Sequence, residues 1–320
     1  MSTQPALNFS TRQNKSIERS LVFESLDTFQ RGGFLNPVRY VGFGSVWFAD
    51  FQLAHRILDP VELISIERND DLVQRAHFNR PFNNILIREG EASIVLPELL
   101  EEKDDDKSWV VWLDYDSWLH PEDLESLLDT AQQLPPSSVL LTTFNSRRGS
   151  YWIDRRQDTL RDRLLTIFGE DIVGPLKESD LQTHSDFVRV LTRLFHESVK
   201  SRLTAVGGLD YVPSFSIPYT DGGADMLTVG GYLSSEENRD GAEKLVGESE
   251  WPGVSLEPID YDPLTLKEVM AMRALLPSET KLNSQYVKDQ CGLKLSDGVI
   301  RGFQQHYKRF PVYSDIGRSI

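Results

Sequence analysis

Apolar residues recur along the chain in runs of two kinds, and each kind predicts a different element. Residues 15–30 show helical spacing at Ile17, Leu21, Val22 and Leu26, so an N-terminal helix is expected before the Gly-rich breaker at 31–33. Short continuous apolar runs bounded by polar turns follow at 39–43, 62–67, 84–89, 108–116 and 137–145. Continuous rather than alternating apolar runs are typical of strands covered on both faces, which predicts a parallel sheet between helical layers.

Helical stretches separate these predicted strands. They lie at 45–58, 69–82, 90–102 and 120–134. The last of them has Pro121 in its first turn, followed by Glu122 and Asp123 where the helix dipole favours acids. Strand and helix therefore alternate for about 110 residues, which predicts an α/β fold.

Beyond residue 150 the pattern changes three times. Residues 151–203 read as a long helical insertion rich in arginine, and 211–233 as two strand-like runs joined by turn residues at 221–223. A polar linker is expected at 234–262 and a small helical C-terminal module at 263–320. We therefore expect a main domain over 1–233 that contains the insertion, followed by the linker and the module.

Composition limits the possible location and partners of the protein. The 320 residues are 39% hydrophobic, and no stretch approaches the roughly 20 uncharged apolar residues that span a bilayer. The first residues lack the apolar core of a signal peptide, so a cytoplasmic location is predicted. Cys291 is the only cysteine, which excludes an internal disulfide framework. The net charge of -15 argues against nucleic acid as a partner.

Candidate chemistry gathers at the predicted strand ends. Gly42 and Gly44, in "RYVGFGSVWF", lie at the first strand-to-helix turn, where glycine permits positive φ and a close approach of a ligand to the backbone. Glu67 ends the second strand, where a carboxylate can accept hydrogen bonds from a ribose diol or pair with Arg68. These positions predict a nucleotide-like cofactor, although a plain structural corner needs the same glycines.

Five strand–helix units followed by a strand hairpin resemble the class I S-adenosylmethionine-dependent methyltransferases, as a divergent member similar to the O-methyltransferases. The resemblance covers residues 15–233 apart from the insertion, and implies a doubly wound, mostly parallel, seven-stranded sheet with one antiparallel strand beside the fifth. It also implies that S-adenosylmethionine is the cofactor, bound by Gly42, Gly44, Ser45 and Glu67, with Glu89 or Glu91 near the adenine. Val46 stands where the family often has a third glycine.

The fourth strand ends in "WLDYDSW", where the resemblance implies substrate-facing or catalytic groups. Asp114 and Asp116 alternate along the strand, so both would project to one side if the strand continued. We predict Asp114 as a base or orienting group, with Asp116 beside it. Asn145 after the fifth strand could complete a magnesium site with them, but it lacks the preceding acid of metal-dependent relatives, so no metal is assigned.

Other functions remain open at this point. A non-catalytic methyltransferase-like subunit could bind a protein partner, or a second copy, through the insertion or the C-terminal helices. A nicotinamide-dependent oxidoreductase would need a tighter glycine motif and a sixth parallel strand. The insertion could bind a phosphate-bearing substrate or carry a salt-bridged face, because its acids alternate with Arg147, Arg148, Arg155, Arg156, Arg161 and Arg163. The basic opening at 12–19 could face the cofactor cleft, but a solvated helix start is the expectation.

Overall fold

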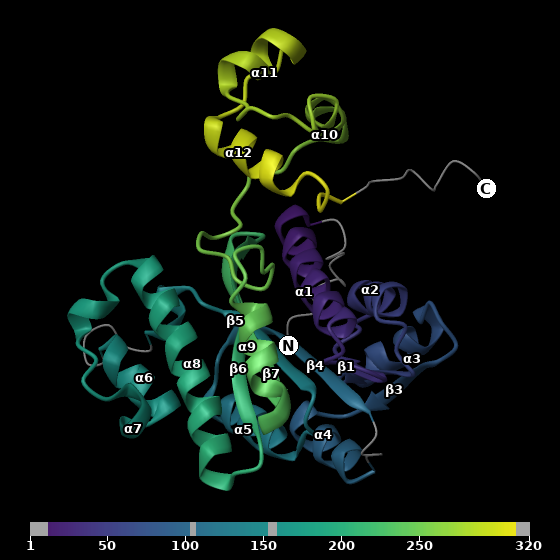
Figure 1. The fold of residues 1–320 in the computed structure, drawn as a ribbon, viewed down its shortest axis with the longest axis vertical. Coiled ribbons are helices and arrows are strands. Elements are labelled where there is room, and N and C mark those ends of the chain that lie inside the picture. The colour runs from purple at the N-terminus through teal and green to yellow at the C-terminus, as the bar shows by residue number, and fades with distance from the viewer. Residues whose placement is uncertain (1–11, 103–106, 153–158, 312–320) are drawn as a thin grey trace.

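The computed structural model describes residues 12–102, 107–152 and 159–311, and these form a seven-stranded sheet flanked by helices (Figure 1). Arg155 and Arg156 of the predicted insertion lie outside the described residues. The strand order is β3-β2-β1-β4-β5-β7-β6. The strands are β1 (Val38–Gly42), β2 (Glu62–Glu67), β3 (Ile85–Glu89), β4 (Ser108–Trp118), β5 (Ser138–Asn145), β6 (Asp210–Asp221) and β7 (Ala224–Ser234).

The sheet has the predicted topology. Strands β1 to β5 pair in parallel, whereas β7 lies antiparallel between β5 and β6. The hairpin that joins β6 to β7 turns at Gly222 and Gly223, whose φ values of 57° and 88° explain why glycine stands at both positions. The prediction of a mostly parallel α/β sheet closed by an antiparallel hairpin is confirmed.

Helices cover both faces of the sheet. One layer consists of α1 (Gln13–Arg31), α2 (Ala49–Ile57), α3 (Asp70–Asn79) and α9 (Glu236–Val246), which share a hydrophobic core with alternate strand residues such as Val110 and Trp112. The opposite layer contains α4 (Ala92–Glu101), α5 (Pro121–Gln133) and α8 (His184–Val206), which pack with Trp109 and Val111. Because side chains alternate along a strand, continuous apolar runs supply both cores.

Between β5 and β6 the described parts of the chain are largely helical. This segment contains η2 (Arg148–Tyr151), α6 (Leu160–Phe168), α7 (Glu170–Val173), η3 (Glu178–Leu181) and α8. It packs on the α5 side of the sheet (Figure 1). Within the described parts of the chain, no helix is both long and apolar enough to cross a bilayer.

The stretch 234–262, predicted as a polar linker, contains α9 and then runs along the outer edge of β6. Isolated parallel bridges join Ser216 to Val254 and Tyr219 to Ile259. Backbone hydrogen bonds from Ser216 and Thr220 also go to this segment. These contacts cover an edge strand whose unpaired backbone groups would otherwise be open to other chains.

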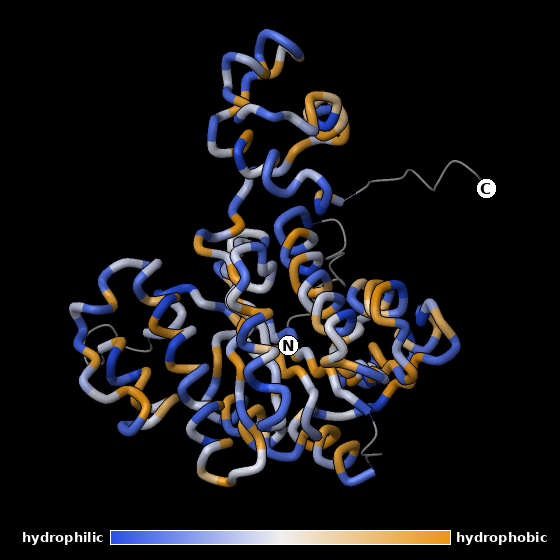
Figure 2. Tube along the Cα trace, viewed as in Figure 1, coloured by the Kyte–Doolittle hydropathy of each residue, from blue (hydrophilic) through white to orange (hydrophobic). Residues whose placement is uncertain are grey.

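The C-terminal segment, called the C-terminal module below, contains the helices α10 (Leu266–Arg273), α11 (Ser284–Cys291) and α12 (Asp297–His306). Figure 2 shows that hydrophobic residues run along the central strands, with a second, smaller group inside this module. The module meets α1 through Arg309, which donates to both carboxylate oxygens of Glu24 at 2.8 and 2.6 Å. It therefore adjoins the helix that lies over the central strands.

Candidate functional site

Asp114 lies in the carboxyl-terminal half of β4, where its regular pairing with β5 ends, on the face that α1 covers. Residues 110 and 112 of the same strand contribute to the core beneath α1, so the alternation of side chains points Asp114 to that helix. Its Oδ2 atom is 2.8 Å from the Nζ of Lys15, and its side chain keeps 24% of its exposure. The Lys15 side chain is only 2% exposed. A buried ammonium group therefore holds a carboxylate that still reaches the surface.

Helix α1 brings two further charged side chains to this place. Lys15, Glu18 and Arg19 are three and four residues apart, which puts them on one helix face. Glu18 is fully buried at 3.6 Å from Lys15, and Arg19 donates to Asp50 of α2 at 2.9 Å. The expectation of a solvated helix start is wrong, because this face packs over the strand ends.

Tyr219 and a chain of hydroxyl groups complete the cluster. Lys15 donates to the Tyr219 hydroxyl at 2.8 Å. Glu18 accepts from the Thr228 hydroxyl at 2.6 Å, Thr228 lies 2.7 Å from Thr143, and the Trp112 indole donates to Thr143 at 3.0 Å. Since an indole N–H can only donate, the hydroxyl protons can point in turn from Thr143 to Thr228 and from Thr228 to Glu18.

Burial sets the protonation of the cluster. Loss of hydration raises the pKa of Glu18 from 4.5 to about 7, against the opposing effect of Lys15 and with a further rise from Asp114. Burial lowers the pKa of Lys15, but Asp114 and Glu18 together raise it well above its ordinary value. Lys15 therefore stays an ammonium, while Glu18 titrates near neutral pH.

Two buried polar atoms in this region have no hydrogen-bond partner among the described residues. They are the Oε2 of Glu18 and the hydroxyl of Tyr40. The Tyr40 hydroxyl is 3.4 Å from the position a Cβ would take at Gly42, so it adjoins the first strand-to-helix turn. Unsatisfied polar atoms in a buried site are costly, which makes this a place where a polar ligand would gain hydrogen bonds.

We expect the stability of the protein to depend on the titration of Glu18. Its folded-state pKa lies above the unfolded value, so the folded state binds the extra proton and this contribution to stability is lost as the pH rises through about 7. Between pH 5 and pH 8, the free energy of unfolding of the wild type should fall by about 2 to 3 kcal/mol more than that of Glu18→Gln. Urea unfolding at both pH values checks this, and equal pH dependence in the two proteins would contradict it.

The glycine turn is built differently from the expectation. Gly42 and Gly44 do not have positive φ; Ser45 and Phe48 do, at 53° and 50°. A Cβ on Gly44 would lie 2.6 Å from both the Phe48 ring and the Ser65 Oγ, and the Gly44 N–H donates to that Oγ at 3.1 Å. The expected positive φ at the glycines is wrong, because internal packing rather than backbone handedness requires glycine at position 44. Val46, where a third glycine was considered, is buried.

The three predicted cofactor acids lie at neighbouring strand ends. Glu67 and Glu89 are paired in register at the ends of β2 and β3, with Glu67 half-buried and Glu89 exposed. The Oε1 of Glu67 accepts from the Asn69 N–H at 3.0 Å. Arg68 lies 3.8 Å from Glu91, so the ion pair considered between Glu67 and Arg68 is not formed. One carboxylate oxygen of Glu67 thus accepts a hydrogen bond from the turn, whereas the other accepts none from the described residues.

Asp116 and Asn145 are separated from Asp114 by an irregularity in the sheet. The register of β4 and β5 shifts between Asp114 and Trp118, so several residues of β4 oppose fewer on β5. Asp116 is exposed, whereas the Asn145 Oδ1 accepts from the Arg147 N–H at 2.8 Å. Among the described residues, no group of three or more His, Cys, Asp or Glu side chains could hold a metal ion.

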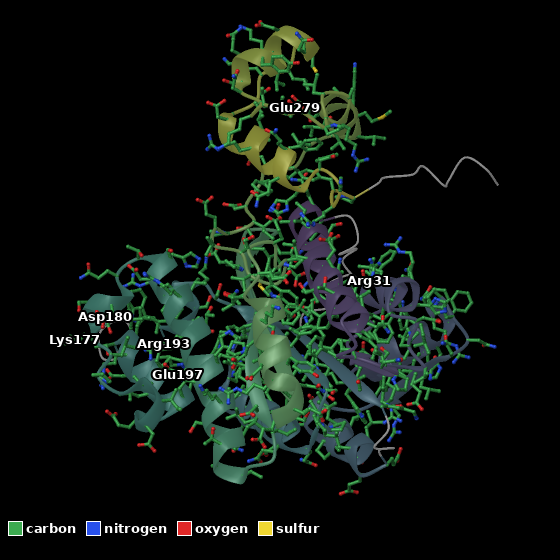
Figure 3. The ribbon with its side chains drawn as sticks, viewed as in Figure 1. Arg31, Lys177, Asp180, Arg193, Glu197 and Glu279 are labelled. Carbon is green, nitrogen blue, oxygen red and sulfur yellow. The ribbon has the colours of Figure 1, made fainter. Side chains whose placement is uncertain are left out.

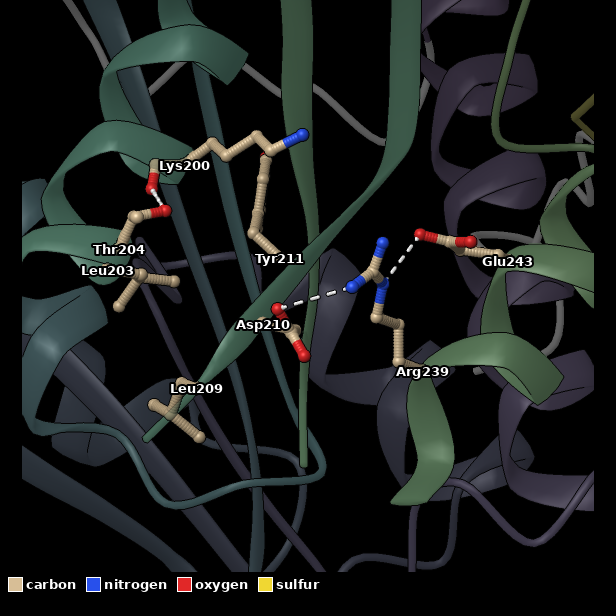
Figure 4. A pocket seen from close by; sticks show the side chains of 8 residues that line it. All are labelled: Lys200, Leu203, Thr204, Leu209, Asp210, Tyr211, Arg239 and Glu243. Carbon is tan, nitrogen blue, oxygen red and sulfur yellow. Dashed lines mark hydrogen bonds and ion pairs between the residues drawn. The ribbon is translucent and has the colours of Figure 1, made fainter. Parts of the chain in front are cut away.

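A cavity of about 60 Å³ lies at the opposite edge of the sheet, where β6 begins between α8 and α9 (Figure 4). Lys200, Tyr211 and Arg239 line it, and Arg239 pairs with Glu243 at 3.0 Å and Asp210 at 3.9 Å. Cofactors of open α/β sheets bind at the carboxyl ends of the strands. This cavity is therefore not the predicted cofactor site.

The charged residues of α1 could have been found in the sequence by one signal. The helical turns that carry the apolar residues Ile17, Leu21 and Val22 also carry charged residues, so part of the helix face is apolar and part is charged. The charged residues are Lys15, Glu18 and Arg19. Tyr219 and Thr228 gave no signal, because they are about 200 residues from Lys15 and Glu18 and reach them only through the β6–β7 hairpin.

Comparison with known proteins gives structural similarities and one family. Trm1 from Pyrococcus horikoshii, in complex with S-adenosyl-L-methionine, is similar over 71% of this chain and 57% of its own, with 12% identity and a TM-score of 0.45. An O-methyltransferase from Bacillus cereus in complex with SAH is similar over 65% and 79%, with 14% identity and a TM-score of 0.37. Human N-acetylserotonin methyltransferase in complex with SAM is similar over 68% and 52%, with 14% identity and a TM-score of 0.33.

No curated protein matches the chain. A family model matches residues 7–317, which is nearly the whole chain. The description of that family is "Putative O-methyltransferase". The chain therefore belongs to this methyltransferase family.

Proposed function

We propose that this protein transfers a methyl group from S-adenosylmethionine to a hydroxyl acceptor at the carboxyl edge of its sheet. The observation that carries the proposal is Asp114, held at the end of β4 by the buried Lys15 ammonium at 2.8 Å. Support comes from the strand order, in which β1 and β4 are the neighbours where the order reverses, and from the family. Such a reversal is where open α/β sheets bind ligands.

The residues at this edge fit the cofactor by their chemistry. An amino-acid end with one positive and one negative charge suits the cluster beside Asp114, which has two cations and two carboxylates, namely Lys15, Arg19, Glu18 and Asp50. The Glu18 Oε2 and the Tyr40 hydroxyl, which have no hydrogen-bond partner among the described residues, would gain hydrogen bonds there.

The remaining predicted residues suit the nucleoside. Glu67 would accept hydrogen bonds from the ribose hydroxyls, and Gly42, Gly44 and Ser45 would border the cofactor with backbone atoms. The adenine would lie near Glu89 or Glu91.

When bound, S-adenosylmethionine supplies a methyl group carried on a positively charged sulfur. The Oδ1 of Asp114, which has no hydrogen bond among the described residues, would accept the proton of the acceptor hydroxyl. Lys15 keeps the Asp114 side chain in one position through Oδ2. Methyl transfer gains chiefly from alignment of the reacting atoms, with general-base assistance as a further contribution.

A second candidate is a non-catalytic methyltransferase-like subunit. One observation favours it: the Phe48 ring and Ser65 fill the space beside Gly44 that a cofactor would approach. In that case the insertion or the C-terminal helices would bind a protein partner or a second copy. Binding of S-adenosylmethionine without turnover on any acceptor would favour this candidate. A nicotinamide-dependent oxidoreductase is not favoured, because antiparallel β7 stands beside β5.

Glu67→Ala tests the proposed cofactor site. Loss of two hydrogen bonds from a ribose diol to a carboxylate should weaken S-adenosylmethionine binding by about tenfold or more, measured by calorimetry on the full chain. The matched control is Glu98→Ala, because Glu98 is an exposed glutamate on α4 that pairs with Arg88. Unchanged affinity in Glu67→Ala would overturn the assignment of Glu67.

A further inference from the structure

Trp118, at the end of β4, is fixed between two other groups. The His120 ring stacks on it with centroids 3.7 Å apart, and the Arg163 Cζ lies 3.9 Å from its centroid. Tyr151 packs against the same indole at 5.9 Å, is buried, and donates its hydroxyl to the Asn145 carbonyl at 3.1 Å. Arg163 of α6 therefore lies in cation–π contact with an indole that the His120 and Tyr151 rings also contact.

Arg148, in η2, has a similar arrangement. Its Cζ lies 4.6 Å from the centroid of Trp152, the residue that follows Tyr151. The Nε atoms of both Arg148 and Arg163 are buried and have no hydrogen-bond partner among the described residues. Neither guanidinium has an ion pair with any carboxylate in the described part of the chain.

Other arginines of the same insertion are paired. Arg161 donates to the carbonyl of Leu176 at 2.7 Å and lies 3.4 Å from Glu170. Arg193 lies 2.8 Å from Glu197 along α8, and Figure 3 shows the two side chains together. The chain carries 49 acidic and 34 basic residues, so carboxylates are abundant. Among the described residues, Arg148 and Arg163 thus lie against indoles without a carboxylate partner, although the chain has many carboxylates.

A guanidinium stacked on an aromatic ring keeps its N–H groups in a fixed plane. This planar fork binds carboxylate or phosphate through two parallel hydrogen bonds, and the stack removes the entropy cost of orienting it. We propose that Arg163 and Arg148 form an anion-binding subsite for the carboxylate or phosphate group of a small methyl acceptor. The subsite rests on the proposed function for its role, because it is the acceptor that it would hold.

The position of the subsite suits that role. Trp118 is four residues beyond Asp114 on the same strand, so their Cα atoms are no more than about 13 Å apart. Trp118 packs with the core on the α5 side, whereas Asp114 faces α1, so an acceptor that contacts both would pass over the carboxyl end of β4, with its hydroxyl at Asp114 and its anionic group at Arg163. The buried Nε atoms favour a small ligand over an acidic protein surface, since a flat surface cannot reach them.

The test is an NMR titration of the full chain, labelled with ¹⁵N, without S-adenosylmethionine. The probes are 4-hydroxybenzoate and 4-hydroxyphenyl phosphate, with 4-hydroxybenzamide as the neutral match. At least one anion should bind saturably, about tenfold or more tighter than the amide. Comparison of the two anions distinguishes a carboxylate site from a phosphate site.

The same titration on variants assigns the site. Arg163→Gln and Arg148→Gln should each weaken binding of the preferred anion about tenfold or more, whereas Arg193→Gln should leave it within twofold. Arg163→Lys keeps the positive charge but lacks the planar guanidinium group, so it should also weaken binding of the anion. This variant tests the site if Arg163→Gln does not fold. Thermal unfolding checks each variant.

Three outcomes would overturn the subsite: no saturable binding of either anion, equal binding of the amide, or equal loss in Arg193→Gln and Arg163→Gln. Binding of a poly-glutamate peptide through Arg163 without binding of the small anions would also overturn it, in favour of a protein surface. S-adenosylmethionine affinity is measured separately. Anion binding without cofactor binding would leave the subsite standing and reject the proposed function, and the reverse result would reject only the subsite.

Discussion

Lys15→Met should lower the free energy of unfolding by about 3 to 5 kcal/mol at pH 8, because it removes the positive partner of a fully buried carboxylate. Methionine retains most of the volume of the side chain, so the cost is electrostatic rather than a cavity. At pH 5.5 the loss should be smaller, since Glu18, with a pKa of about 7, is then protonated and needs no counter-charge.

Urea unfolding of two companion variants isolates that effect. Lys15→Met with Glu18→Gln should recover most of the stability at pH 8, because the unpaired charge is gone. Lys200→Met replaces an exposed lysine on α8 and should change stability by less than about 0.5 kcal/mol. A loss of equal size at both pH values, or no recovery in the double variant, would contradict the electrostatic account.

Asp114→Asn should lower kcat for methyl transfer by about 10² to 10⁴-fold while leaving S-adenosylmethionine bound. The amide keeps an oxygen for the Lys15 hydrogen bond but cannot take the acceptor proton. The assay follows release of S-adenosylhomocysteine over a panel of hydroxyl acceptors that carry a carboxylate or a phosphate.

Asp116→Asn is the matched control for that variant. Asp116 is exposed, and no ion pair involves it within the part of the chain that the structure describes. Its replacement should change kcat by less than about threefold. A similar loss of kcat in both variants would mean that Asp114 has no role distinct from that of Asp116. The two predicted catalytic aspartates would then act together.

The sheet could be predicted because each strand carries its own signal. Continuous apolar runs at 62–67 and 138–145, for example, belong to strands that are buried on both faces, and turn residues at 221–223 define the hairpin. Such signals are local, so a single sequence contains them. The antiparallel position of β7 followed from the resemblance to methyltransferases, and the observed strand order agrees with it.

The candidate site could be predicted only in part. Asp114 could be predicted because it follows a strongly apolar strand. Its partner Lys15 could not be predicted, because it is 99 residues away in sequence and approaches Asp114 only after α1 packs on the sheet. The conformation of the glycine turn was predicted wrongly for a related reason. A sequence motif cannot distinguish a glycine that makes room for a ligand from one that makes room for Phe48.

The most direct test of the account is a calorimetric titration of the wild-type chain with S-adenosylmethionine. We expect saturable binding with one molecule per chain, and no comparable heat with a nicotinamide dinucleotide under the same conditions. Absence of saturable binding of S-adenosylmethionine to the folded protein would contradict it.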